Sequence, residues 1–379
     1  MKNSIIFLFI LGLLQISILS AQPTSKVTIS ISNMGKDSVR EKVIQIPWTL
    51  VKSKMPNVDT SKLIVLDASG KKQLAFQFEK NGTDSIHNLL LQMSIGKGQT
   101  KGIILAYAKR VYFPSKTYGR FVPERKEDFT WENDKIAFRM YGKELEKTPK
   151  ENAYGIDVWV KSTDRMVINE RYLRGKYHED IGDGLDYYHV GLTLGAGNCM
   201  PYVNDSIYYS KNYTSWKILD NGPLRTTFEL GYDVWDVNGK NVAATKNISI
   251  DAGSQMNKIM VTYLHDQKEK LPIAIGIVKR ADKGVILQNE QQGIMGYWEP
   301  PYKTDGTTGV GVIIPGGLTR MSVTGKQILA YAETNENETF TYYTGAAWDK
   351  AGVITNEQQW FDYLKKKKIE LESAKIVFR

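Results

Sequence analysis

The sequence predicts an all-β protein, built as a large antiparallel β-sandwich with a smaller N-terminal β-domain. Three observations support this fold class. Short apolar or alternating runs recur roughly every 8 to 15 residues, Asn-Gly turn pairs separate several of them, and only one segment has clear helical periodicity. An α/β protein of this length would need many more helical segments.

Each predicted strand is a short apolar or alternating run bounded by Gly, Asn, Asp or Pro. These runs are Val27–Ile31, Val43–Ile46, Leu63–Leu66, Leu74–Phe78, Leu89–Met93, Ile103–Ala106, Ile136–Met140, Ile156–Val160, Val242–Ile250, Lys258–Leu264, Ile273–Val278, Val310–Ile314 and Phe340–Tyr343. Three turn pairs of the kind that close β-hairpins lie at Asn81-Gly82, Asn221-Gly222 and Asn238-Gly239.

The one predicted helix lies near the end of the chain. Thr355 is the expected N-cap, and Gln358 three residues later completes a capping box. Trp360, Tyr363 and Leu364 follow at helical spacing, so we expect them to attach this helix to the body of the protein.

The first residues predict export. Lys2 precedes an apolar run from Ile5 to Leu19, and Ala21 offers a small residue for cleavage, so residues 1–21 are expected to be a signal peptide. The run is shorter than the roughly 20 residues that span a bilayer, and no cysteine follows it for a lipid anchor. We expect a soluble periplasmic protein without a membrane anchor; a retained anchor is the alternative.

Two domains are expected after the signal peptide. Residues 22–113 contain about six predicted strands and resemble a small β-sandwich. From Tyr118 onward Trp, Tyr, Arg and acidic residues crowd together, so residues 114–379 are expected to form the larger sandwich and to carry the functional site. No internal repeat is visible, which argues against a propeller or a solenoid.

Composition limits the chemistry. The formal net charge is +9, or +8 once Lys2 is removed with the signal peptide. An exported basic protein is expected to meet a polyanionic glycan rather than nucleic acid, although excess lysine could serve solubility alone. The single cysteine, Cys199, excludes an internal disulfide, and the four histidines lack metal-ligand spacing. We therefore expect no metal and no cofactor. The sequence does not indicate an oligomeric state.

A first polar-aromatic cluster runs from Tyr118 to Asp134, and we expect it to consist of loops. It contains Tyr118, Arg120, Arg125 and Trp131. Aromatic faces stack on sugar rings, and arginine grips carboxylate or sulfate through two parallel hydrogen bonds. These residues are therefore candidates for substrate binding. The alternative is a surface loop with internal ion pairs.

A second cluster, from Arg171 to His189, contains the strongest catalytic candidates. His178 and His189 lie in it together with Arg174, Tyr187 and Tyr188. Histidine, tyrosine and arginine can together move protons near an anionic substrate. Two alternatives remain: a purely structural role for both histidines, or a calcium loop, which the acidic and glycine residues resemble without EF-hand spacing.

A third cluster combines Trp298 and Glu299 with a Pro-Pro turn, and Trp348 and Asp349 form a similar pair. Such pairs suit the rim of a sugar-binding site, or equally a plug at the end of a sandwich. Cys199 has no matched base nearby in sequence, so it is a weak candidate for a nucleophile.

Four blocks resemble an exported family of Bacteroidetes that long lacked an assigned function. They are Phe121–Arg139, His178–Tyr188, Tyr297–Pro301 and Tyr342–Lys350. Members of that family are typically encoded in polysaccharide utilisation loci, beside hydrolases of 4,5-unsaturated uronic acids. Ala244–Ser254 is also similar to galactose-mutarotase-type supersandwich proteins. The resemblance extends to a marine member that suggests an ulvan oligosaccharide dehydratase.

The resemblance implies a β-elimination of water from a terminal uronic acid. Such a reaction needs a cation to neutralise the carboxylate, a base to take the C5 proton and an acid to protonate the departing hydroxyl. The candidates for these roles are, in that order, Arg120, Arg125 or Arg174; His178 or His189; and Tyr187 or Tyr188. The alternatives are a chain-cleaving polysaccharide lyase, a non-catalytic glycan-binding protein and an aldose-epimerase-like enzyme.

Overall fold

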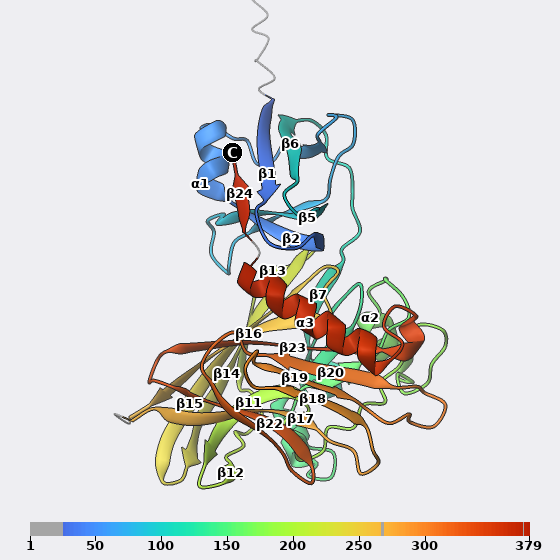
Figure 1. Cartoon of the computed structure of the whole chain (residues 1–379), viewed down its shortest axis with the longest axis vertical. Coiled ribbons are helices and arrows are strands. Elements are labelled where there is room, and N and C mark those ends of the chain that lie inside the picture. Colours follow the sequence, from blue (N-terminus) through green and yellow to red (C-terminus); the bar gives the residue numbers. More distant parts are fainter. Residues whose placement is uncertain (1–25, 267–268, 374) are drawn as a thin grey trace, which may run out of the picture.

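The computed structural model describes residues 26–266, 269–373 and 375–379 (Figure 1). The predicted signal peptide, residues 1–21, lies outside the described residues. The described chain is built mainly from antiparallel sheets, so the predicted fold class is confirmed. No helix among the described residues is long and apolar enough to cross a membrane.

The N-terminal unit consists of two small sheets around their own apolar core (Figure 1). One sheet has the order β24-β1-β6-β3 and the other β2-β5-β4. The bounds are β1 Val27–Asn33, β2 Val39–Pro47, α1 Trp48–Lys54, β3 Leu63–Asp67, β4 Phe76–Glu79, β5 Asn88–Ile95, β6 Thr100–Tyr107 and β24 Ile376–Phe378. The last strand of the chain thus returns to pair with the first one, although the sequence placed it in the larger domain.

The larger unit holds three sheets of eight, five and four strands. Their orders are β13-β14-β15-β16-β23-β20-β19-β18, β12-β11-β17-β22-β21 and β10-β9-β8-β7. The bounds are β7 Thr117–Val122, β8 Asp128–Asn133, β9 Ala137–Met140, β10 Asp157–Trp159, α2 Ile168–Arg174, β11 Ala196–Val203, β12 Ser206–Ile207, β13 Ser215–Asn221, β14 Arg225–Val237, β15 Lys240–Asp251, β16 Met256–His265, β17 Leu271–Val278, β18 Val285–Asn289, β19 Ile294–Trp298, β20 Thr308–Ile313, β21 Leu318–Val323, β22 Gln327–Thr334, β23 Thr339–Trp348 and α3 Glu357–Ser373.

Alternation along the strands builds the core between these sheets. Successive side chains of a strand point to opposite faces, so every second residue of β15 faces inward. Ile248 and Ile250 are fully buried in the main core, whereas Ser249 between them is on the outer face. The same rule places Ile259 of β16 inward and its neighbour Lys258 outward.

Helix α3 covers the outer face of β19 and β20 (Figure 1). Trp360 and Leu364 are fully buried there, as the predicted helical spacing required. The helix begins one residue later than predicted, because the side chain of Asn356, not Thr355, accepts the Gln359 backbone N–H at 3.0 Å. A Cβ on Gly311 would lie 2.6 Å from Leu364, so this close approach requires glycine.

The first predicted cluster is not a set of loops. Residues 117–122 and 128–133 are the paired strands β7 and β8, joined through a short 3₁₀ turn at Pro123–Arg125. The second cluster begins in helix α2 and continues as irregular chain. The first cluster forms strands because charged side chains such as Glu132 and Asp128 are paired inside the fold instead of facing water.

Candidate active site

The irregular chain from Gly175 to Gly195 carries both predicted histidines. Two backbone hydrogen bonds fix its path: Val160 N–H donates to Leu185 O at 3.0 Å, and Asp186 N–H donates to Tyr177 O at 2.8 Å. Gly184 has a φ of 93°, and a Cβ there would lie 2.2 Å from Val160 O. Glycine is therefore required for this segment to lie against β10.

A carboxylate cluster surrounds Arg139 of β9. Its Nη2 lies 2.5 Å from Asp157 Oδ2 and 2.9 Å from Asp186 Oδ2, and its Nη1 lies 3.7 Å from Asp128 Oδ2. All four side chains are buried. Burial, reinforced by the charge of Asp157, raises the pKa of Asp186 well above its ordinary value. One guanidinium thus holds three carboxylates in place.

His178 lies at the solvent-facing side of this cluster. Its Nδ1 is 2.7 Å from the backbone oxygen of Asp186, and its side chain is 65% exposed. A carbonyl oxygen can only accept a hydrogen bond, so Nδ1 carries the proton. The other nitrogen, Nε2, is therefore the basic atom when the ring is neutral.

His189 belongs to a histidine–tyrosine cluster. This cluster comprises His189, Tyr302, Tyr187, Tyr188, Arg280, Glu299 and Thr308. His189 Nε2 lies 3.2 Å from the Tyr302 hydroxyl, and Tyr302 stacks on Tyr187 with ring centroids 5.9 Å apart. Partial burial lowers the pKa of His189, and the positive charge of Arg280 lowers it further. His189 is therefore neutral near pH 7 and able to accept a proton.

Arg280 joins several members of the histidine–tyrosine cluster. Its Nε lies 2.7 Å from Glu299 Oε1, its Nη1 donates to the backbone oxygen of His189, and its guanidinium lies 4.7 Å from the centre of the Tyr188 ring. Glu299 is buried, and this burial raises its pKa to about 7 despite the contact with Arg280. Near neutral pH the positive charge of Arg280 is thus only partly neutralised.

The two predicted tyrosines are held inside the fold. The Tyr187 hydroxyl lies 2.7 Å from Thr308 Oγ1, and the Tyr188 hydroxyl is buried without a hydrogen-bond partner among the described residues. Burial raises the pKa of both phenols. Both phenols therefore stay protonated, and they pack beneath the surface of the site.

Several predicted residues lie together and others do not. His178, Tyr187, Tyr188, His189 and Glu299 belong to the two adjoining clusters, and Arg125 Nε reaches their edge by donating to the Tyr177 hydroxyl at 3.1 Å. Three further predicted residues have other partners. Arg120 pairs with Glu124, Arg174 lies 3.7 Å from Asp183, and the Tyr118 hydroxyl lies 3.3 Å from Asn169.

The two tryptophans predicted to stack on sugars must be corrected. Trp131 is fully buried in the main core, where its Nε1 donates to Asn257 at 2.8 Å. Trp298 is 7% exposed and packs in the core beneath α3. Neither ring presents a face to a ligand, because large apolar rings fill the space between layers.

The calcium loop is also not formed. Asp180 accepts the backbone N–H groups of Gly182 and Gly184, Asp183 lies beside Arg171 and Arg174, and Asp186 contacts Arg139. These carboxylates point to separate partners. In the described part of the chain no group of three or more His, Cys, Asp or Glu is arranged to hold a metal ion.

Sequence reasoning missed Arg139, Asp157, Arg280, Tyr302 and Thr308. Tyr302 directly follows the Pro-Pro turn of the third cluster, so that cluster was the available signal. Arg280 had none, because it stands alone after β17 and meets His189 only in the fold, 91 residues away.

Residues 31–377 match the family described as a domain of unknown function, DUF4861. The chain belongs to the DUF4861 family. A relative in Formosa agariphila, the uncharacterized protein P7, is 33% identical to this DUF4861 chain over 323 residues, which cover 79% of the chain and 80% of the relative.

Solved structures show the fold alone. A glycosyl hydrolase family 38 protein from Enterococcus faecalis matches with a TM-score of 0.51 and 9% identity, covering 93% of this chain and 47% of its own. An α-mannosidase from Enterococcus faecalis V583 matches with a TM-score of 0.49 and 8% identity, covering 93% and 46%. The DUF4861 chain spans about half the length of these proteins. The family match and the relative in Formosa agariphila confirm that the chain belongs to a family without an assigned function.

Proposed function

We propose that this protein is a carbon–oxygen lyase, a dehydratase that eliminates water from the non-reducing-end uronic acid of oligosaccharides such as those from ulvan. The product is a 4,5-unsaturated uronate. The observation that carries the proposal is the pairing of a neutral, exposed His189 with the Tyr302 hydroxyl at 3.2 Å, beside the charge of Arg280. The predicted signal peptide is the basis for placing this reaction in the periplasm.

The pair can perform both proton transfers of the elimination. His189 Nε2 takes the proton from C5, and the electron pair of that C–H bond forms the C4–C5 double bond as the C4–O bond breaks. Tyr302 gives its hydroxyl proton to the departing oxygen, which leaves as water. The proton on His189 then returns to the Tyr302 oxygen across the 3.2 Å contact, and the pair is restored. Each positioned proton-transfer group contributes roughly 10²–10⁴ in rate.

The C5 proton becomes acidic only when the neighbouring carboxylate is neutralised. Arg280, which donates to the backbone oxygen of His189, is one cation at the site, and Lys303, whose Nζ lies 5.0 Å from the centre of the Tyr302 ring, is a second. These two residues take the role that the sequence assigned to Arg120, Arg125 or Arg174. Tyr302 likewise takes the role of acid, because the hydroxyls of Tyr187 and Tyr188 are buried.

The test is product detection with purified protein and ulvan oligosaccharides. Ultraviolet absorbance reports the new conjugated alkene, and mass spectrometry reports whether one water has left an intact oligosaccharide. Shorter unsaturated fragments would instead identify a chain-cleaving lyase. Binding without any product from uronate-containing glycans would refute catalysis and leave a glycan-binding protein.

The site is tested with a matched pair of histidine variants. We expect His189→Ala to lower kcat by about 10²–10⁴ while the fold is retained. His87→Ala is the control, because His87 is exposed in the N-terminal unit and contacts Thr83. Full activity of His189→Ala would refute its role as the base.

A further inference from the structure

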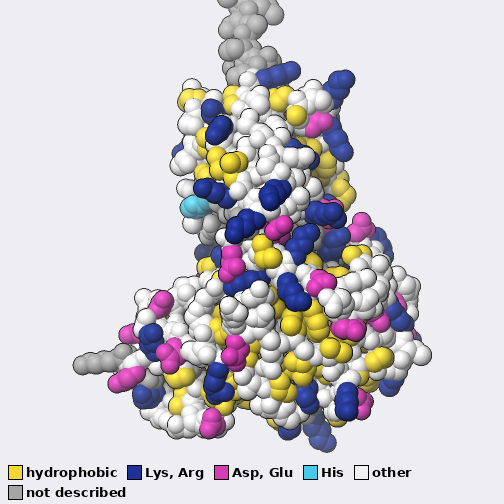
Figure 2. Space-filling model, in the orientation of Figure 1, with side chains coloured by type: hydrophobic (Ala, Val, Ile, Leu, Met, Phe, Trp, Pro, Cys, Tyr) yellow, Lys and Arg dark blue, Asp and Glu magenta, His cyan; other side chains and the backbone are white. Residues whose placement is uncertain are grey.

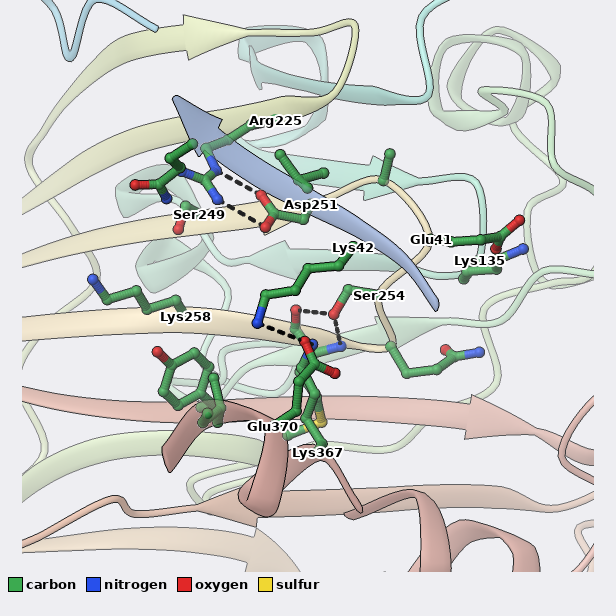
Figure 3. A pocket seen from close by; sticks show the side chains of 18 of the residues that line it. Glu41, Lys42, Lys135, Arg225, Ser249, Asp251, Ser254, Lys258, Lys367 and Glu370 are labelled. Carbon is green, nitrogen blue, oxygen red and sulfur yellow. Dashed lines mark hydrogen bonds and ion pairs between the residues drawn. The ribbon is translucent and has the colours of Figure 1, made fainter. Parts of the chain in front are cut away.

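A large cleft lies between the N-terminal unit and the eight-stranded sheet, away from the histidine–tyrosine cluster. It has a volume of about 990 Å³ and is lined by β2, by the outer faces of β14, β15, β16 and β23, and by α3 (Figure 3). Its size is that of a pocket for a small organic ligand or short oligomer. None of His178, His189 and Tyr302 is among its lining residues.

Strand register builds the floor of this interdomain cleft. Thr227 of β14 is opposite Ser249 of β15, Ser249 is opposite Lys258 of β16, and Lys258 is opposite Tyr343 of β23. All four side chains line the cleft. Neighbouring strands lie about 4.8 Å apart, so these groups form a row across four strands. Across the strands the row presents two hydroxyls, from Thr227 and Ser249, then the ammonium of Lys258 and the phenol ring of Tyr343.

The cleft has an excess of positive charge. Its lining contains seven Lys or Arg residues, Arg40, Lys42, Lys135, Arg225, Lys258, Lys366 and Lys367, and four acids, Glu41, Glu79, Asp251 and Glu370. Figure 2 shows Lys and Arg side chains gathered at the waist between the two units.

Most of the acids are already paired. Arg225 binds Asp251 through two hydrogen bonds of 2.6 and 2.8 Å and contacts Glu79 at 2.7 Å. Glu370 is shared by Lys42 at 2.9 Å and Lys367 at 3.4 Å (Figure 3). These pairs hold the walls together and leave little negative charge for the remaining cations.

Lys258 is a cation on the floor of the cleft that makes no ion pair with a carboxylate of the described residues. Within the described residues its ammonium makes no hydrogen bond or ion pair, and Figure 3 shows it extending along the sheet away from the other labelled charges. Burial lowers its pKa and the nearby charge of Arg225 lowers it further, although the negative charges of Asp251 and Glu79 partly offset this. An anionic ligand at this point would relieve both effects.

The neutral lining supplies further hydrogen-bonding groups. Gln255 is 9% exposed, and its Oε1 is buried without a partner among the described residues. Asn247 and Ser249 add an amide and a hydroxyl on the floor. Tyr363 is fixed by stacking on Trp360 at 5.4 Å, and its hydroxyl accepts the Gln255 backbone N–H at 3.0 Å. Hydroxyl and amide groups around a cation match a ligand that is both rich in hydroxyls and negatively charged.

We propose that the interdomain cleft is a second binding site, which holds an acidic oligosaccharide with one carboxylate or sulfate group on Lys258. The lyase activity is not required for this binding, because the lining residues are separate from the histidine–tyrosine cluster. Such a site would hold the glycan on the same molecule that carries the proposed active site.

Binding is measured by calorimetry on the full chain carrying His189→Ala, so that no turnover consumes the ligand. The probes are hexagalacturonate, which has only carboxylates, a carrageenan hexasaccharide, which has only sulfates, and neutral cellohexaose. We expect at least one acidic probe to bind and cellohexaose to bind at least about tenfold more weakly. Binding of neither acidic probe, or equal binding of cellohexaose, would overturn the proposal.

Lys258→Gln is the decisive variant, and Lys326→Gln is its control, because Lys326 is an exposed lysine outside the cleft. We expect Lys258→Gln to weaken acidic binding by about tenfold or more, Lys258→Arg to retain most of it, and Lys326→Gln to leave it unchanged. If Lys258→Gln and Lys326→Gln bind the acidic probe with equal affinity, the proposed binding site is refuted. If the cleft binds an acidic glycan but the wild type forms no product, only the proposed lyase activity is refuted. If the wild type forms product but Lys258→Gln binds the acidic probe as tightly as its parent, only the proposed cleft site is refuted.

Discussion

The buried lysine of β15 gives a prediction whose size follows from the structure. Lys246 is 1% exposed and faces the interior of the sandwich. Its Nζ donates to Asn198 Oδ1 at 2.5 Å and to Cys199 O at 3.1 Å, and it lies 4.7 Å from the centre of the Tyr232 ring. It has no ion pair with a carboxylate of the described chain. Burial therefore lowers its pKa from 10.5 to about 8.

The sign of the effect on stability follows from proton binding. Between pH 8 and pH 10.5 the unfolded chain holds the Lys246 proton more tightly than the folded chain, so stability rises with pH across this window. Each pKa unit corresponds to about 1.4 kcal/mol, so the charged lysine costs the folded protein about 3 kcal/mol at pH 7. Most of this cost is gone at pH 10.

The variant Lys246→Met measures the free-energy cost of burying this charge. Methionine fills a similar volume without charge, and both acceptors keep another donor: Cys199 N–H reaches Asn198 Oδ1 at 2.9 Å, and the Tyr263 hydroxyl reaches Cys199 O at 3.1 Å. We expect the free energy of unfolding of the wild type, relative to the variant, to rise by about 2–3 kcal/mol from pH 7 to pH 10.

Urea unfolding followed by tryptophan fluorescence at both pH values measures this difference. Lys326→Met is the control, because an exposed lysine should change stability equally at the two values. A difference between wild type and Lys246→Met that does not depend on pH would refute the reasoning.

Three further predictions concern the site. Tyr302→Phe should lower kcat by about 10²–10⁴ in the alkene assay without changing the melting temperature by more than a few degrees, and unchanged kcat would remove Tyr302 as the acid. Glu299 has a pKa raised by burial from 4.5 to about 7, so its contribution to stability is present below pH 4.5 and lost as pH rises through 7. Urea unfolding should thus show the wild type losing stability relative to Glu299→Gln between pH 5 and 7, and parallel curves would contradict this. Arg139→Leu should cost about 3–5 kcal/mol in the same measurement, because it leaves three buried carboxylates without their cation, and a cost under about 1 kcal/mol would refute that pairing.

The local pattern of apolar and polar residues was sufficient to predict much of the fold. Alternation along β15 and β16 fixed which side chains face the core, and the spacing of Trp360 and Leu364 fixed the buried side of α3. The sequence failed between Tyr118 and Asp134, where charged residues suggested loops. Glu132 shows why: it is fully buried in β8, where Lys161 Nζ donates to it at 2.7 Å and the backbone N–H of Ile168 donates at 2.8 Å. Local rules treat such a residue as exposed because its partners are distant in sequence.

The sequence by itself determined the β-rich fold class, because short-range periodicity can be read along the chain. It also singled out the segment with His178 and His189 as a candidate site from its residue types. Only the tertiary structure decided which groups surround those histidines. Arg280 and Tyr302 meet His189 from 91 and 113 residues away, and Trp131 and Trp298 turn inward. Likewise, the row from Thr227 to Tyr343 in the interdomain cleft exists only through strand register. Turn pairs such as Asn238-Gly239 indicate individual hairpins, but the pairing of β16 with β23 and the packing of the layers depend on contacts between distant segments, which leave no local signal.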